Sequence, residues 1–159
     1  MAYMKNVGKS RTDKYKDLDT YSDVITYCCN PQKAYSIGFA NVSSAQNAAN
    51  EMELVAMKGR KSTGKKICHI VVSFAPEELR YCSVNAIDHI AQRCMKYFSS
   101  RYQVLYAIHD YPHPHIHLVV NRVSFVDGKR YLDRYEDRER FWVFLHGILS
   151  NYGIRLWHE

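Results

Sequence analysis

Alternating apolar and polar residues predict several short strands along the chain. The clearest runs from Ile67 to Phe74, because β-branched residues dominate it and Ala75-Pro76 ends it. Two more strands, Tyr102 to His109 and His115 to Phe125, flank a short segment that contains two prolines. Proline cannot donate to a central ladder, so we expect this segment to be the turn of a hairpin. Weaker strand patterns occupy residues 2–7, 35–42 and 154–157.

Apolar residues at intervals of three and four predict four helices. The first spans Asp17 to Cys29 and ends at Asn30-Pro31. On its helical wheel Tyr27 lies about 140° from the centre of the apolar stripe, so its side chain projects away from the local core. Capping or stop residues mark the other three helices, at Ser44, Ser83 and Gly153. Strands in adjacent hairpins mixed with helices predict an α+β fold, a central antiparallel sheet flanked by helices.

The composition narrows the class of protein. With 159 residues, 47% of them hydrophobic and 24% charged, residues 1–159 are expected to form a single globular domain. No apolar segment approaches the roughly 20 residues of a membrane span, and there is no signal peptide, so a cytoplasmic protein without membrane contact is expected. The five cysteines lack paired spacing, which argues against a disulfide framework or a zinc knuckle.

Positive charge is concentrated in two places. The formal net charge is +6, and the excess lies near the N-terminus and in a loop rich in Ser, Thr and Gly. The first cluster comprises Lys5, Lys9, Arg11, Lys14 and Lys16, and the second comprises Lys58, Arg60, Lys61, Lys65 and Lys66. Such clusters suit a polyanion such as DNA, although solvated loops of this composition are also common. The thirteen tyrosines add aromatic faces on which unpaired bases could stack.

Four of the eight histidines lie within nine residues at the expected hairpin. The predicted register places His109 opposite His115, with Cβ atoms roughly 5 Å apart. His117 shares the face of His115 because side chains alternate along a strand. Ala107, expected opposite His117, leaves room for an ion. Three imidazoles on one face predict a metal site.

Three polar residues near the predicted metal site have roles that the pattern leaves open. His113 lies on the turn between the prolines. Asp110 follows the first predicted ligand and could orient an imidazole or accept a proton, although as a strand neighbour it points away from the histidine face. Asn121 could order the site or satisfy a neighbouring backbone group.

The hairpin resembles the metal motif of the relaxases of mobilisable and conjugative plasmids and transposons. These are histidine-hydrophobe-histidine single-strand endonucleases, and the hairpin especially resembles that of the branch that includes the Agrobacterium T-DNA border nuclease. Their pattern is a His and an Asp, a gap, His-x-His, a hydrophobic triplet and Asn. Here it is His109-Asp110, His115-Ile116-His117, Leu118-Val119-Val120 and Asn121.

Other segments are similar to the same family. Residues 23–33 resemble the segment that carries the nucleophilic tyrosine, a Tyr followed by Asn-Pro-x-Lys, which here is Tyr27 with Asn30-Pro31-Gln32-Lys33. Residues 69–74 resemble the family's His-hydrophobic-Ser-Phe strand, which contains Ser73. The spacing of the first His and the Asp departs from the family pattern, where one residue usually separates them. That departure leaves the role of Asp110 open.

The resemblance implies a DNA relaxase that starts conjugative mobilisation. Such an enzyme nicks one strand at an origin of transfer, in a site- and strand-specific transesterification that leaves a 5′-phosphotyrosyl bond. The resemblance implies Mg or Mn held by His109, His115 and His117. It implies Tyr27 as nucleophile and Asp110 as a base that promotes loss of the Tyr27 proton. DNA contacts are expected from Lys58, Arg60, Lys61, Lys65, Lys66, Ser73 and Asn121. The expected partners are single-stranded or supercoiled origin DNA, an accessory DNA-binding protein and a coupling protein in a bacterial cytoplasm.

Two alternatives remain open at this point. A replication-initiator or transposase-type nuclease shares the metal site but predicts a nucleophilic tyrosine on a helix after the hairpin, where Tyr135 and Tyr152 are available. A metal-dependent small-molecule hydrolase, or a DNA-binding protein without catalysis, predicts activity or binding that survives loss of Tyr27. Tyr21 is the reserve nucleophile of the relaxase hypothesis, although its place on the apolar stripe argues for packing. The chain is either the nuclease part of a longer protein or a compact member of the family.

Overall fold

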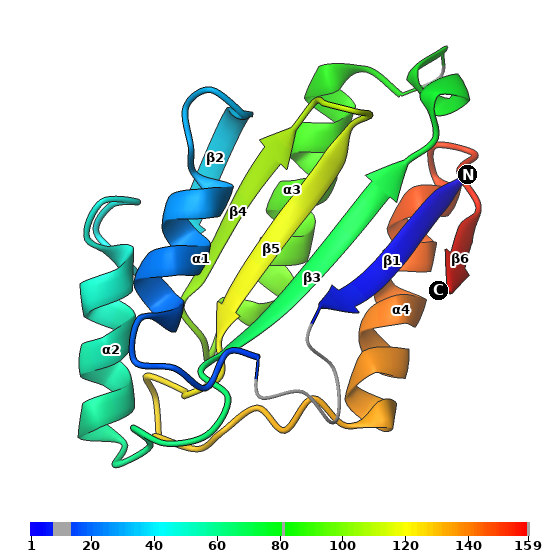
Figure 1. Cartoon of the computed structure of the whole chain (residues 1–159). Coiled ribbons are helices and arrows are strands. Elements are labelled where there is room, and N and C mark those ends of the chain that lie inside the picture. Colours follow the sequence, from blue (N-terminus) through cyan, green and yellow to red (C-terminus); the bar gives the residue numbers. More distant parts are fainter. Residues whose placement is uncertain (8–13, 81, 159) are drawn as a thin grey trace.

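The computed structural model shows a six-stranded sheet with two helices on each face (Figure 1). It describes residues 1–7, 14–80 and 82–158. The strands are β1 (Ala2–Val7), β2 (Ala34–Ala40), β3 (Ile67–Phe74), β4 (Val104–His109), β5 (His115–Asn121) and β6 (Leu156–His158). The helices are α1 (Thr20–Cys28), α2 (Ala48–Lys58), α3 (Val84–Phe98) and α4 (Tyr135–Ser150), with a short 3₁₀ helix at Pro76–Arg80. The predicted α+β fold is confirmed.

The strand order is β2-β4-β5-β3-β1-β6. Every neighbouring pair is antiparallel except β1 and β6, which are parallel because the chain returns to the sheet after α4. The expected antiparallel sheet therefore carries one parallel strand at its edge. The β4–β5 hairpin lies inside the sheet, so each of its strands is hydrogen-bonded to a neighbouring strand on both edges.

Alternation along the strands divides the core into two layers. Residues such as Ile108, Ile116 and Leu118 point toward α3 and α4, with Phe141 and Leu145 of α4 packed against them. The other face carries a smaller apolar cluster under α1 and α2. In Figure 1 α1 lies in front of β2 and beside β4, and α2 lies to the left of α1, whereas β5, β3 and β1 have no helix in front of them. The sheet face that carries His109, His115 and His117 is therefore covered by helices only toward β2.

Several element boundaries differ from the sequence prediction. Helix α1 begins at Thr20 rather than Asp17, and Leu18 before it is 77% exposed. Ser44 accepts a hydrogen bond from the backbone N–H of Asn47, so it caps a turn that precedes α2. Strand β5 ends at Asn121, and only an isolated bridge at Val123 continues the ladder toward Phe125. Each shift occurs at the end of a helix or strand, where element boundaries are least defined.

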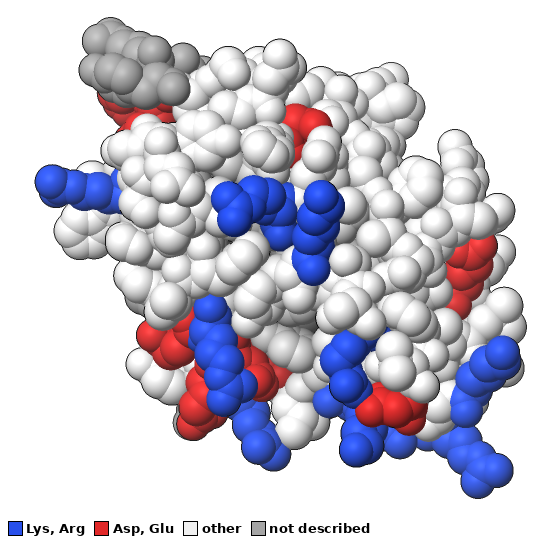
Figure 2. All heavy atoms as spheres, turned by 180° about the vertical axis from the view of Figure 1, so that it is seen from behind, with Lys and Arg blue, Asp and Glu red and all other residues white. Residues whose placement is uncertain are grey.

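Among the residues that the structure describes, Lys and Arg do not form a continuous band on the α3–α4 side. Figure 2 shows that face, where Lys and Arg side chains are scattered and several lie beside Asp or Glu. In the described part of the chain, no helix has the length and apolar character required to cross a membrane.

Candidate metal and nucleophile site

The β4–β5 register brings three histidines together as predicted. His109 pairs with His115, and His117 pairs with the fully buried Ala107. The ring centroids lie 5.1 Å apart for His109 and His115, 4.4 Å for His109 and His117, and 4.9 Å for His115 and His117. One ring nitrogen from each lies within 4.8 Å of the others. The three imidazoles form a cluster at the hairpin end of the sheet.

Hydrogen bonds orient these rings for ligation. His109 donates from Nε2 to the carbonyl of Cys28 at 2.7 Å, and His115 donates from Nδ1 to the carbonyl of His113 at 2.8 Å. Each ring therefore keeps a lone pair on its other nitrogen. His117 Nε2 is buried and has no hydrogen-bond partner. A buried nitrogen without a hydrogen-bond partner, beside two oriented imidazoles, is the arrangement expected of ligands for a divalent cation.

Burial favours the uncharged form of two of the three imidazoles. Burial and the neighbouring histidines lower the pKa of His117 to about 3. Burial likewise lowers the pKa of His115 below its ordinary value. Neutral imidazoles have the lone pairs that ligation requires, so these two rings can bind a cation at neutral pH.

A second group, Cys28, His69 and His117, overlaps the first. Burial raises the pKa of the Cys28 thiol to about 12, so the thiol stays protonated at neutral pH. Nε2 of His69 and Nδ1 of His117 already lie in hydrogen-bond contact at 2.9 Å. The three-histidine cluster therefore fits a cation such as Mg²⁺ or Mn²⁺ better than the cysteine-containing group does.

The predicted nucleophile Tyr27 lies against this cluster. Helix α1 buries Tyr21, Ile25 and Cys28, which leaves the Tyr27 side chain 51% exposed on the opposite side, as its wheel position predicts. The Tyr27 ring meets His109 and His117 edge-on, with centroid distances of 6.0 Å and 5.7 Å. The bond from His109 to the Cys28 carbonyl ties the end of α1 to the sheet. A solvent-accessible phenol thus lies beside the candidate metal ligands.

Lys33 is a site residue to which sequence reasoning gave no role. The backbone N–H of Lys33 donates to the carbonyl of Asn30, in a turn that reverses the chain after α1. Its ammonium then lies 4.6 Å from the centroid of the Tyr27 ring. The signal was present in the Asn-Pro-x-Lys spacing. His69 and Tyr15 were also missed, because their contacts with the site depend on tertiary packing.

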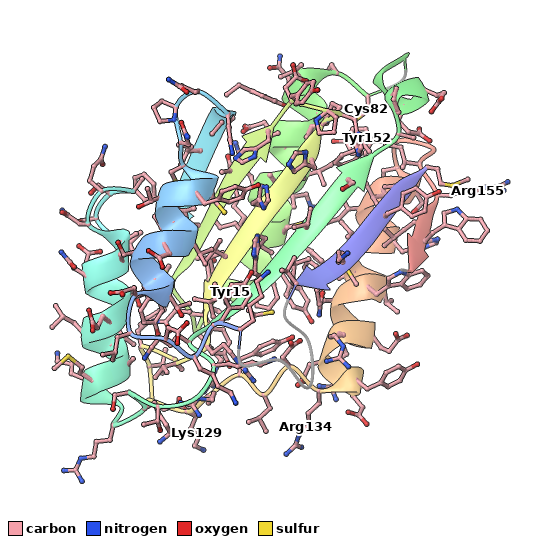
Figure 3. All side chains as sticks on the ribbon, in the orientation of Figure 1. Tyr15, Cys82, Lys129, Arg134, Tyr152 and Arg155 are labelled. Carbon is pink, nitrogen blue, oxygen red and sulfur yellow. The ribbon has the colours of Figure 1, made fainter. Side chains whose placement is uncertain are left out.

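The other candidate tyrosines lie away from the cluster. Tyr21 is 2% exposed, its hydroxyl donates to Asn121 Oδ1 at 2.9 Å, and burial raises its pKa. Tyr135 begins α4, and Tyr152 follows that helix on the opposite face of the sheet, where it contacts His89 (Figure 3). Their positions do not match a nucleophile that acts at the three histidines.

Asp110 and Ser73 occupy different positions relative to the cluster. Ser73 pairs with His115 across β3 and β5 and is half-buried beside it. Asp110 is exposed, and within the described residues it forms no hydrogen bond with the histidines or Tyr27. After burial, the Asp110 charge is the next cause that raises the pKa of Tyr35 to about 12. The role of Asp110 as a proton acceptor stays a prediction.

The second basic cluster lies at the far end of the sheet. Its loop joins α2 to the start of β3, whereas Ser73, beside the histidines, lies near the end of that strand. Seven strand steps separate Lys66 from Ser73, a distance of roughly 23 Å. Lys66 itself is buried and donates to the carbonyl of Ser62. Lys58, Arg60, Lys61 and Lys65 could therefore contact only DNA remote from the site. Lys9 and Arg11 of the first cluster lie outside the described residues.

Two of the predicted DNA contacts are corrected by burial. Lys66 is 5% exposed, and Asn121 is completely buried at the same end of the sheet. Asn121 donates to the carbonyl of Met52 and to Gln103, and it accepts from Tyr21 and from the backbone N–H of Val123. Asn121 therefore joins α1, α2 and β5 and has no free group to offer a nucleic acid.

Replacing Asn121 with alanine should destabilise the fold and leave DNA binding by the folded protein unchanged. The change leaves several buried polar groups without partners, which costs about 3 kcal/mol of unfolding free energy. Urea unfolding measures that loss, with the exposed Asn85→Ala on α3 as a control expected to stay within about 0.5 kcal/mol of wild type. Wild-type stability in Asn121→Ala would contradict the assignment.

Comparison with known proteins bears on the fold and the family of the chain. The family model described as the MobA/VirD2-like relaxase nuclease domain matches residues 27–154, from Tyr27 through the histidine hairpin. A solved structure described as the molecular basis of vancomycin resistance transfer in Staphylococcus aureus has the same fold, with a TM-score of 0.56 at 12% identity. The likeness covers 100% of this chain and 98% of that chain. No curated protein matches the chain. Because the family model spans most of its length, the chain belongs to the MobA/VirD2-like relaxase nuclease-domain family.

Proposed function

We propose that this chain nicks one strand of DNA at an origin of transfer, in a site- and strand-specific, metal-dependent transesterification that starts conjugative mobilisation. One observation carries the proposal: the half-exposed Tyr27 lies edge-on to His109 and His117, and His117 Nε2 is buried without a partner. A nucleophile and three ligands for a cation are thereby within reach of one phosphate group.

The reaction exchanges one phosphoester bond for another. The Tyr27 oxygen attacks the scissile phosphorus, the bond from phosphorus to the 3′ oxygen breaks, and the released oxygen takes a proton to become a 3′-OH. The phenol loses its proton, and the 5′ phosphate stays on Tyr27, so the step is reversible. When bound by His109, His115 and His117, Mg²⁺ or Mn²⁺ supplies Lewis-acid stabilisation of charge on the phosphate oxygens.

Lys33 supplies positive charge beside the nucleophile. Its ammonium lies over the Tyr27 ring, and its exposed end can contact a phosphate oxygen. A cation at this position stabilises the additional negative charge that develops on the phosphate oxygens in the transition state. Lys33 therefore serves the chemical step, whereas the loop lysines serve only general attraction to DNA.

Two surface features, one beside α1 and one across β3 and β1, suit an unpaired strand. A hollow of about 500 Å³ lies beside α1, and it is lined by apolar residues such as Ile25 and Ile37 and by the amides of Asn30, Gln46 and Asn50. Apolar walls with amide groups are suited to stacking a base and reading its edge. On the other side of the cluster, the register continues from His115 through Ser73 to the exposed Tyr3. Single-stranded or locally melted origin DNA is the substrate that these features fit, delivered by accessory and coupling proteins.

Lys33→Ala should slow nicking by about 10-fold or more, because charge stabilisation at the phosphate is lost. Initial rates with saturating Mn²⁺ measure the effect, and Lys33→Arg should recover part of the rate. Lys58→Ala removes a lysine that is also exposed, at the far end of the sheet, and should have little effect on the rate. Equal rates for Lys33→Ala and wild type would remove Lys33 from the mechanism.

A nicking assay tests the proposal as a whole. Supercoiled plasmid that carries the DNA flanking this gene is incubated with the protein and Mg²⁺ or Mn²⁺. We expect nicked circles with a free 3′-OH and protein attached at the 5′ end. Metal binding without any nicking, even with the accessory proteins of the same locus added, would favour a hydrolase or a non-catalytic DNA-binding protein.

A further inference from the structure

A chain of hydrogen bonds leads from His117 into the protein interior. Nδ1 of His117 lies 2.9 Å from Nε2 of His69, and Nδ1 of His69 lies 2.8 Å from the Tyr15 hydroxyl. The exposed fractions of His117, His69 and Tyr15 are 5%, 6% and 8%. Tyr15 lies in front of the sheet beside α1 (Figure 3). A histidine and a tyrosine without any assigned role are thus linked to a candidate metal ligand.

Metal ligation by His117 fixes which atoms donate and which accept in this series of hydrogen bonds. A neutral imidazole has one N–H and one lone pair, so His117 can bind a cation through Nε2 only when its proton is on Nδ1. Nδ1 then donates to Nε2 of His69, and Nδ1 of His69 donates to the Tyr15 oxygen. The opposite direction would place an N–H on His117 Nε2, which is buried and has no hydrogen-bond partner. A buried donor without an acceptor is costly, so the first direction is favoured.

His117 differs in this respect from the other two ligands. His109 and His115 donate to backbone carbonyls, which can only accept, so their tautomers are fixed by the backbone. The partner of His117 is another imidazole, which can donate or accept. Whether His117 presents a lone pair or an N–H to the cluster therefore depends on His69.

Tyr15 is held in a backbone conformation that few residues of its size adopt. Its φ is 69°, in the left-handed region, which is unfavourable for a residue with a bulky side chain. The backbone N–H of Lys66 donates to the Tyr15 carbonyl and holds the residue at the start of β3. Strain of this kind persists where the surrounding structure requires it. Here the strained conformation of Tyr15 accompanies a hydrogen bond between its hydroxyl and His69.

We propose that His69, supported by Tyr15, is a positioning residue that holds His117 in the Nδ1–H tautomer and so sets the affinity of the three-histidine cluster for a divalent cation. This inference rests on the proposed function, in which that cluster binds such an ion. It assigns His69 an effect on metal binding that is present before DNA arrives.

The first test measures Mn²⁺ affinity of the purified protein without DNA, from the electron paramagnetic resonance signal of free Mn²⁺. His69→Leu should bind Mn²⁺ about 10- to 100-fold more weakly, as is typical when a partner of a ligating histidine is lost. His69→Gln should stay much closer to wild type, because its amide oxygen can accept from His117 Nδ1. Tyr15→Phe should show a smaller loss. Tyr106→Phe, which loses a hydroxyl bonded to Asp88 on the other face, should show none.

The second test reads the tautomer directly in the metal-free protein. Nitrogen-15 NMR of the imidazole rings distinguishes a protonated nitrogen from one with a lone pair. We expect His117 to carry its proton on Nδ1 in the wild type and in His69→Gln, and to populate the Nε2–H form in His69→Leu. Unchanged thermal unfolding of the variants would show that the fold is retained.

Three results would overturn the inference. They are wild-type Mn²⁺ affinity in folded His69→Leu, a wild-type His117 protonated on Nε2, or a thiolate-to-Co²⁺ charge-transfer band that disappears in Cys28→Ser. The last would place the ion among Cys28, His69 and His117. If the wild type binds Mn²⁺ and nicks DNA while His69→Leu is unaffected, only the positioning role fails. If the wild type binds no Mn²⁺, the metal site of the proposed function fails as well.

Discussion

Tyr27→Phe should abolish the covalent attachment of protein to nicked DNA and lower nicking by about 1,000-fold or more, as loss of a nucleophile typically does. The substitution removes the attacking oxygen and keeps the ring, so the edge-on contacts with His109 and His117 are retained. Mn²⁺ affinity and stability should therefore stay at the wild-type level. Denaturing gels of labelled plasmid DNA measure attachment, and Mn²⁺ titration measures the retained site.

Tyr152→Phe is the matched control for this change. It removes the hydroxyl of a tyrosine that lies against His89 behind the sheet, and it should leave attachment intact. The reverse pattern, with attachment lost in Tyr152→Phe and kept in Tyr27→Phe, would favour the replication-initiator or transposase type of nuclease. Attachment kept in both variants would contradict the role of Tyr27 and point to a third tyrosine.

Loss of one candidate ligand should have the second largest effect. His115→Ala should lower nicking by about 100- to 1,000-fold at a metal concentration that saturates the wild type, because charge on the phosphate is no longer stabilised. A chelator should have the same effect on the wild-type protein. His115 is only half-buried, so its loss should cost less fold stability than loss of His117.

The neighbouring His113 provides the control for the ligand change. His115 donates to the backbone carbonyl of His113, and an alanine at position 113 retains that carbonyl. His113→Ala should therefore nick at close to the wild-type rate. Full activity in His115→Ala would mean that the hairpin histidines do not hold the working ion.

The geometry of the histidine cluster could be predicted from the sequence because it depends on local rules. Two prolines place the turn, and the period of two along a strand then fixes which side chains share a face. The predicted pairs, His109 with His115 and His117 with Ala107, are those observed. The outward position of Tyr27 followed from helical spacing in the same way.

Contacts between elements could not be predicted, because local rules contain no information on how helices dock. The bond from His109 to the Cys28 carbonyl, which brings Tyr27 to the cluster, depends on the seating of α1 on the sheet. The bonds among Tyr15, His69 and His117 join β5 to β3 and β3 to the segment before α1, so they depend on strand pairing and on the path of that segment. The parallel pairing of β6 with β1 likewise follows from the path of the chain around α4.

DNA contacts are the features that the sequence predicts least well, because charge and residue type do not determine where a side chain lies relative to the histidines. The basic loop before β3 satisfies the composition of a phosphate-binding segment, yet it lies at the end of the sheet opposite the histidines. Asn121 satisfies the family pattern but bonds only to the protein itself. Position relative to the histidine cluster, rather than charge, separates Ser73 and Lys33 from these residues.

The most direct test of this account identifies the residue that carries the DNA. The wild-type protein is trapped on supercoiled plasmid with the flanking DNA and Mn²⁺, the DNA is digested, and the peptides are mapped by mass spectrometry. We predict a nucleotide attached through its 5′ phosphate to Tyr27, in the peptide that contains Cys28 and Asn30. An adduct on any other residue, or nicked DNA that is joined to no residue, would contradict the account.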